Sequence, residues 1–188
     1  MKMIPSDHFV RFYNEVFKFL DKENGLEKYY LEISRHQELH CYDCFIKKGL
    51  EGMEEYWGHI RVEENCILNS CIEGRVRYTH MKRCPSLTKV LDNDAGACEK
   101  YCIHCPGWVI PLMTKCGFYY IKYQHAMDVP ECFGACSEYR EEIEKIRDEA
   151  KRQGFKYIFS NLDEFETVEK NRACRISLQQ KEEKNDPK

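Results

Sequence analysis

The chain has 188 residues, and with 43% hydrophobic against 32% charged side chains it carries enough apolar material for one folded domain. Its 29 basic and 32 acidic residues give a formal net charge of -3, which argues against nucleic acid as a partner. No stretch reaches the ~20 apolar residues of a membrane span, and the N-terminus lacks a signal-peptide core. The sequence therefore predicts a cytoplasmic protein with no nucleic acid or membrane partner.

Helical periodicity dominates the first third of the chain. Apolar residues recur at helical spacing over residues 6–20, and Asn24-Gly25 is a typical helix stop. A second helix is expected over residues 26–40 and a third over residues 45–60, each with an apolar side that can be buried.

The period then changes to that of β-strands. Residues 66–72 and 76–80 alternate around a Glu73-Gly74 turn, which predicts a β-hairpin. Aromatic and branched residues over 118–123 predict a third strand. Helices are also expected over residues 86–92, 107–116 and 137–152, and a short strand over residues 155–159.

These elements predict an α+β fold with a helical N-terminal third and a small, mostly antiparallel sheet with helices packed on one side. Residues 1–175 form a single domain in this interpretation. Residues 176–188 are rich in charge and are expected to form a disordered tail.

The most unusual feature is cysteine, at 12 of 188 residues, a high content for a cytoplasmic protein whose thiols have no role. Two or three intervening residues can place successive sulfurs on the same side of a turn or helix, which favours metal binding. The cysteines fall into these groups: Cys41/Cys44, Cys66/Cys71, Cys84, Cys98/Cys102/Cys105, Cys116, Cys132/Cys136 and Cys174.

The CxxxCxxC segment of Cys98, Cys102 and Cys105 is the strongest of these groups. Its thiolates can hold a [4Fe-4S] cluster with one iron open, or zinc with Cys84, Cys116 or His104 as the fourth ligand. The same spacing occurs in radical-SAM enzymes, but this chain is too short for their barrel and has no recognisable SAM-binding glycine segment. We therefore predict a metal centre of Cys98, Cys102, Cys105 and Cys84, with [4Fe-4S] as the first choice and zinc as the second.

Three other roles for the cysteines stay open. Some are expected to pack as small hydrophobic side chains, first among them Cys66, Cys71 and Cys174. Four thiolates on one ion or cluster would close the site and make a non-catalytic metal-binding or electron-transfer module. Thiol–disulfide redox chemistry is the third, through the pairs Cys41/Cys44 or Cys132/Cys136.

A reacting thiol needs a base or a cation beside it at neutral pH. His80 precedes Cys84 by four residues, and His104 lies inside the CxxxCxxC segment. Cys84, His80 and His104 are therefore the candidate catalytic residues, as nucleophile and bases. Both histidines are equally compatible with ordinary surface or core positions.

Three segments carry a resemblance to a known family: Met81-Lys-Arg-Cys84-Pro85, the run from Tyr101-Cys102-Ile-His-Cys105-Pro106-Gly107-Trp108 to Leu112, and Cys116-Gly117-Phe118-Tyr119. They span the middle half of the chain and resemble the L-2-amino-thiazoline-4-carboxylate hydrolase family of small cytosolic proteins. The resemblance implies cleavage of a small sulfur-containing heterocycle toward a cysteine derivative.

Together these observations predict a cytoplasmic metal- or iron-sulfur-binding enzyme of hydrolase or lyase type. The metal centre would act as a Lewis acid on a sulfur or nitrogen atom of a small-molecule substrate. The chain is also compatible with a homo-oligomer.

Overall fold

The computed structural model describes residues 7–92 and 96–185. Its helices are α1 (Asp7–Lys22), α2 (Leu26–Gln37), α3 (Asp43–Glu63), α4 (Pro85–Leu91), α5 (His104–Cys116), α6 (Arg140–Arg152) and α7 (Phe165–Asn185). Its strands are β1 (Ile67–Glu73), β2 (Val76–Arg83), β3 (Tyr119–Gln124), β4 (Cys132–Ser137) and β5 (Tyr157–Ser160). Three short turns of π- or 3-10 helix complete the list: η1 (Glu38–Tyr42), η2 (Tyr101–Ile103) and η3 (Leu162–Glu164). The expected first helix corresponds to α1, and its expected start at Ser6 lies outside the described residues.

The strands form one antiparallel sheet with the order β1-β2-β4-β3-β5. β1 and β2 are the predicted hairpin, and Gly74 occupies its turn with a φ of 59°. The strand absent from the predictions is β4, because Gly134 and Ala135 at its centre have low strand propensity. It lies in the middle of the sheet, between β2 and β3. The α+β class is confirmed.

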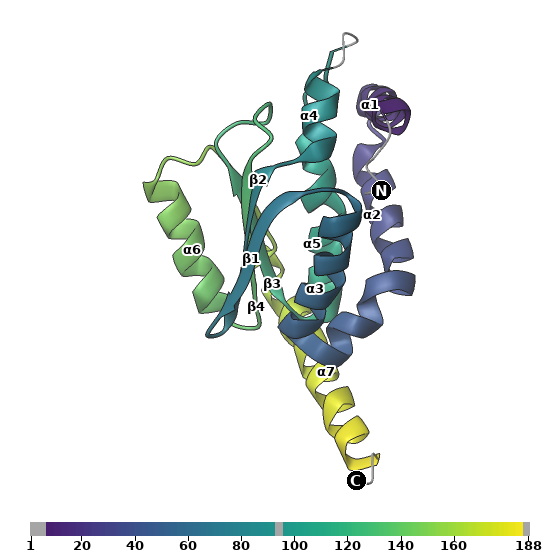
Figure 1. The fold of residues 1–188 in the computed structure, drawn as a ribbon. Coiled ribbons are helices and arrows are strands. Elements are labelled where there is room, and N and C mark those ends of the chain that lie inside the picture. Colours follow the sequence, from purple (N-terminus) through teal and green to yellow (C-terminus); the bar gives the residue numbers. More distant parts are fainter. Residues whose placement is uncertain (1–6, 93–95, 186–188) are drawn as a thin grey trace.

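Helices cover both faces of the sheet. Figure 1 shows α6 on one side and α2, α3 and α5 on the other. Because side chains alternate along a strand, Ile121 of β3 packs in a cluster with Ile143 of α6, whereas Tyr120 packs against the cluster formed by α3 and α5. The expected one-sided packing is thus incomplete, since β3 is covered on both faces. We call the face toward α3 and α5 the inner face.

Helix α1 fixes the segment that leads into α5. The side chain of Asn14 accepts a hydrogen bond from the backbone N–H of Cys98 and donates one to the carbonyl oxygen of Gly96, each at 2.8 Å. The buried ring of Phe17 packs against the rings of Tyr101 and His104, with centroids 5.4 and 5.2 Å away. These contacts hold η2 and the first turn of α5 against α1.

The long helix α7 extends beyond the body of the molecule (Figure 1) and ends at Asn185. This differs from the disordered tail expected for residues 176–188, of which 186–188 lie outside the described residues. Arg175, only 2% exposed, helps to fix the helix: its Nε donates to the carbonyl oxygen of Cys116 at 3.1 Å, and its guanidinium lies 4.2 Å from the ring centre of Phe118. The charged residues that follow are good helix formers, which explains the continuation.

Candidate functional site

A buried lysine marks the site. Lys122 of β3 projects from the inner face and is only 4% exposed. Its Nζ donates a hydrogen bond to the carbonyl oxygen of Cys102 at 3.1 Å. Within the described part of the chain, no carboxylate forms an ion pair with it. A buried ammonium without a carboxylate is costly, so another group must supply the compensating charge.

Four cysteines are electrostatic neighbours of this ammonium. They are Cys84, Cys102, Cys105 and Cys132, which we call the cysteine quartet. They also interact with one another, and Cys105 is a neighbour of each of the other three. The quartet is drawn from four elements: the start of α4, η2, α5 and β4.

Local backbone geometry places each sulfur. Cys132 projects from the inner face because it lies two residues before Gly134, the cross-strand partner of Lys122. Cys84 is the N-cap of α4, where Pro85 ends β2 and begins the helix, and its sulfur accepts a hydrogen bond from the N–H of Leu87. The N–H of Cys84 also donates to the carbonyl oxygen of Pro130 at 2.7 Å, which ties α4 to the loop before β4.

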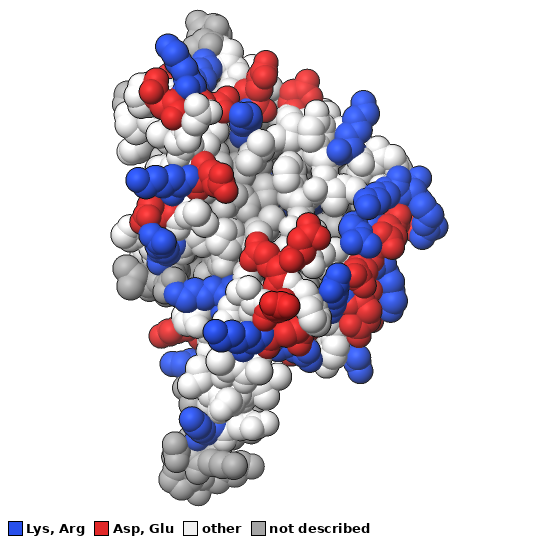
Figure 2. All heavy atoms as spheres, turned by 180° about the vertical axis from the view of Figure 1, so that it is seen from behind, with Lys and Arg blue, Asp and Glu red and all other residues white. Residues whose placement is uncertain are grey.

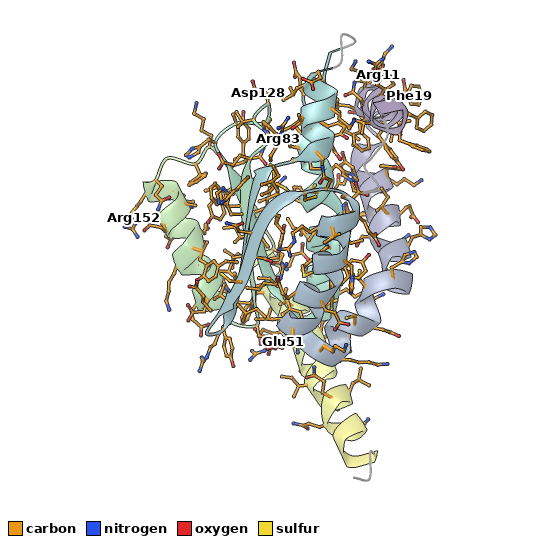
Figure 3. The ribbon with its side chains drawn as sticks, in the orientation of Figure 1. Arg11, Phe19, Glu51, Arg83, Asp128 and Arg152 are labelled. Atoms are coloured by element: carbon orange, nitrogen blue, oxygen red, sulfur yellow. The ribbon has the colours of Figure 1, made fainter. Side chains whose placement is uncertain are left out.

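Cys84 directly follows Arg83, the last residue of β2, which Figure 3 labels, and Cys132 is the first residue of the neighbouring strand β4. Asp128 is an electrostatic neighbour of Cys102. Cys105 is exposed, whereas Cys84, Cys102 and Cys132 are partly buried. The site is therefore reached from solvent at Cys105 and closed at its inner end by Lys122.

Burial and the ammonium act on the thiols in opposite directions. Burial raises the pKa of Cys84 to about 12 and that of Cys132 to about 11, and it also raises the pKa of Cys102. Lys122 lowers the pKa of Cys132 and of Cys102 and so offsets part of this rise. Burial lowers the pKa of Lys122 itself, but the quartet reverses this effect, and the net direction is upward.

Two buried polar atoms near the quartet have no hydrogen-bond partner. Gln124, two residues after Lys122 on the same face, donates through Nε2 to the carbonyl oxygen of Ala126, whereas its Oε1 has no partner. The Nδ1 of His104 is also unpartnered. Burial lowers the pKa of His104 to about 4, and the nearby Lys122 adds to this effect, so the imidazole is neutral at pH 7.

Cys98 is not an electrostatic neighbour of Lys122. It is 5% exposed and belongs to the apolar cluster that includes Phe17 and Val90, against which Cys84 and Cys102 also pack. Its strongest electrostatic neighbours are Asp21, Lys18 and Lys100, and no member of the quartet is among them. The CxxxCxxC segment therefore divides: Cys102 and Cys105 face Lys122, and Cys98 faces α1. Of the predicted set, Cys84, Cys102 and Cys105 share Lys122 with Cys132, whereas Cys98 is not among the neighbours of Lys122.

Neither candidate histidine forms a hydrogen bond with a thiol within the described residues. His80 pairs with Phe133, whereas the neighbouring Met81 pairs with Cys132, so His80 projects from the opposite face of the sheet. Its ring stacks on Phe133 at 4.3 Å, and its Nε2 lies 2.7 Å from Oε1 of Glu131. His104 packs between aromatic rings of α1 and α2, and no hydrogen bond joins it to a thiol within the described residues.

The remaining close pairs do not converge on Lys122. Cys41, Cys44, Cys116 and Cys136 belong to or pack against the apolar cluster of α3 and α5. Cys132 and Cys136 lie on one strand, roughly 13 Å apart at the rise of an extended chain, too far for a disulfide. The expected redox pair Cys132/Cys136 is therefore excluded by the strand.

Lys122 is the residue of this site that spacing arguments missed. It is the single charged residue of the strand predicted over 118–123, which is the only sequence signal of its position. Within residues 7–92 and 96–185, no group of three or more His, Cys, Asp and Glu side chains is arranged so that it could hold a metal ion. The quartet thus consists of side chains that can bind a metal, but their sulfur atoms lie farther apart than the ligands of one metal ion.

Comparisons with known protein families, with curated proteins and with solved structures find no match to this chain. These comparisons therefore neither support nor contradict the resemblance to the L-2-amino-thiazoline-4-carboxylate hydrolase family. Among the described helices, none has the length and apolar character needed to cross a bilayer. Figure 2 shows acidic and basic side chains interspersed over much of one face, in keeping with the small net charge.

Proposed function

We propose that the cysteine quartet is a thiolate centre that binds a soft metal ion, with a [4Fe-4S] cluster as the first choice and zinc as the second. We further propose that the protein is a cytoplasmic enzyme that uses this centre on a small sulfur- or nitrogen-containing molecule, as the family resemblance implies for a sulfur heterocycle. The observation that carries the proposal is the buried ammonium of Lys122, whose electrostatic neighbours are cysteine sulfurs and not carboxylates.

Charge balance supports a thiolate centre. As neutral thiols, the quartet would leave the ammonium of Lys122 without an anion, at a cost of several kcal/mol. A divalent ion held by four thiolates carries a charge of roughly -2, and a buried cation beside it reduces this excess. Binding would also deprotonate the thiols, whose pKa burial otherwise raises, because the metal takes the place of their protons.

The members of the quartet would have different roles. Cys84, Cys102 and Cys132, which are partly buried, would hold the metal in place. Cys105, which is exposed, would be the ligand at which solvent and substrate reach the centre. Bound metal would act as a Lewis acid on a sulfur or nitrogen atom of the substrate. Binding requires the four sulfurs to move closer by side-chain rotation, because their present arrangement is wider than a coordination sphere.

The test is anaerobic purification followed by elemental analysis and a visible absorption spectrum. Cys132→Ser and Cys98→Ser form a matched pair, since both remove one sulfur but only Cys132 lies beside Lys122. We expect Cys132→Ser to lose most of the bound metal and Cys98→Ser to retain it. Equal metal content in both variants, or none in the parent protein, would contradict the proposal.

A second measurement separates the enzyme from a closed electron-transfer module. Cyanide or a small thiol is added to the metal-loaded protein while the spectrum is followed. A spectral change that depends on Cys105 supports an exchangeable, catalytic position. An unchanged spectrum together with unfolding on chelation supports a structural or electron-transfer centre.

A further inference from the structure

Cys102 and Cys105 form a CxxC pair at the start of α5. The residues between them have helical backbone angles, with φ and ψ of -69° and -20° at Ile103 and of -49° and -53° at His104. Helical rise and radius place Cα atoms three residues apart at a separation of roughly 5 Å. A disulfide spans Cα separations of about 4.4 to 6.8 Å. The Cα separation of the pair therefore suits a disulfide, and closure requires the two Cβ atoms, about 5–6 Å apart at this helical spacing, to approach by about 1–2 Å.

The two thiols differ in access. Cys105 is exposed, whereas Cys102 is partly buried, and the two interact electrostatically. A small oxidised molecule therefore meets Cys105 first, and Cys102 is the nearest thiol along the helix that can respond. This is the arrangement of an attacking thiol with a resolving thiol behind it.

An ammonium group and a side-chain amide lie beside this pair. Lys122 interacts with both sulfurs, and its Nζ is hydrogen-bonded to the main-chain oxygen of Cys102. Burial raises the pKa of Cys102, whereas Lys122 and the side-chain amide of Gln124 oppose this rise. Cys102 lies in η2, directly before α5, and Cys105 lies in the first turn of α5, where unpaired N–H groups stabilise negative charge.

We propose that Cys102 and Cys105 are a redox-active dithiol that exchanges with low-molecular-weight disulfides. The thiolate of Cys105 attacks one sulfur of the disulfide, so that a mixed disulfide forms and one small thiolate leaves. The thiolate of Cys102 then attacks the sulfur of Cys105, closes the Cys102–Cys105 disulfide and releases the second small thiolate. The protein loses two electrons and the small disulfide gains them. The activity requires no metal.

Oxidised glutathione serves as the probe. The full-length reduced protein is treated with it under argon, both as purified and after chelation and desalting, and the products are identified by intact mass and peptide mapping. We expect a disulfide between Cys102 and Cys105 and the release of two equivalents of glutathione. Cys102→Ser should stop at one glutathionyl group on Cys105, and Cys105→Ser should slow the reaction at this site at least tenfold.

Cys174→Ser is the control, because Cys174 is exposed on α7 and is not a neighbour of Lys122. It should form the Cys102–Cys105 disulfide at the parent rate. The proposal is overturned when this disulfide is absent from both the purified and the chelated samples, or when Cys84 or Cys132 closes a disulfide in its place. Metal content measured on the same samples keeps this result separate from the fate of the proposed metal centre.

Discussion

The ammonium of Lys122 donates a hydrogen bond to the main-chain oxygen of Cys102 at 3.1 Å, and this bond joins strand β3 to η2, the turn that leads into α5. The same ammonium is the shared electrostatic neighbour of four cysteines that come from four elements. A cation in this position links the protonation of the thiols to the packing of α5 on the sheet.

Lys122→Met removes this charge and retains most of the side-chain volume. Because the ammonium lowers the pKa of Cys102 and of Cys132, we expect both values to rise in the variant. Alkylation by iodoacetamide below these pKa values should then slow about tenfold for each unit of pKa change. The measurement is the pH profile of alkylation at each cysteine by mass spectrometry. Lys122→Arg retains the charge and should retain the profile; a profile unchanged by Lys122→Met would contradict the assignment.

His104 is expected to make the fold sensitive to acid. Its pKa is about 4 in the folded protein because burial disfavours the charged ring, against an ordinary value of 6.5. The unfolded chain therefore binds the proton first, and the free energy of unfolding falls as the pH decreases from 6.5 toward 4. At pH 5 the loss is about 2 kcal/mol.

Urea denaturation at pH 7.5 and pH 5 measures this loss, with His104→Phe as the comparison. Phenylalanine preserves the ring contacts with Phe17 and Tyr30 and does not titrate. The variant should lose less stability than the parent between the two pH values. An equal loss in both proteins would show that His104 is not the group responsible.

Glu54→Ala is expected to destabilise the protein by about 2 kcal/mol. Arg77, which is 4% exposed, donates through Nε to the carboxylate of Glu54 at 2.8 Å and lies over the ring of Trp57. Without Glu54 this buried guanidinium loses its partner, although partial exposure of the carboxylate limits the cost. Glu51→Ala, at an exposed position on the same helix (Figure 3), is the control for urea denaturation and should be nearly neutral.

Gly117→Ala and Gly74→Ala separate two costs of replacing a glycine. Both residues have positive φ, 72° and 59°, so alanine is strained at each by about 1 kcal/mol. A Cβ at Gly74 meets open space, whereas at Gly117 it overlaps the backbone of Arg172 in α7. Thermal unfolding should therefore show a clearly larger loss for Gly117→Ala. Similar losses would mean that α7 can move away from the end of α5 without cost.

The periodicity of the sequence was sufficient for most of the elements. The hairpin of β1 and β2, strand β3 and the helices before and after them follow from local patterns and from stops such as Gly117, which ends α5 in the left-handed conformation. Strand β4 was not predicted, because its residues are small and it is stabilised by the strands on both sides. The continuation of α7 likewise depends on packing, as the burial of Arg175 shows.

Local spacing drew attention to Cys102 and Cys105, because three residues along a helix bring two side chains to one side. Local spacing could not determine that Cys98 packs against α1, or that the His80 side chain projects from the face of the sheet opposite to Lys122. It also could not determine that Cys132, on strand β4, lies beside Lys122 with the other members of the quartet. These positions depend on strand register and on how α1 and α5 pack, which are set by contacts between residues far apart in the chain. The sequence by itself determined which side chains are available for chemistry. Only the tertiary structure decided which of them lie beside the ammonium of Lys122, because burial and strand pairing bring together residues that are far apart along the chain.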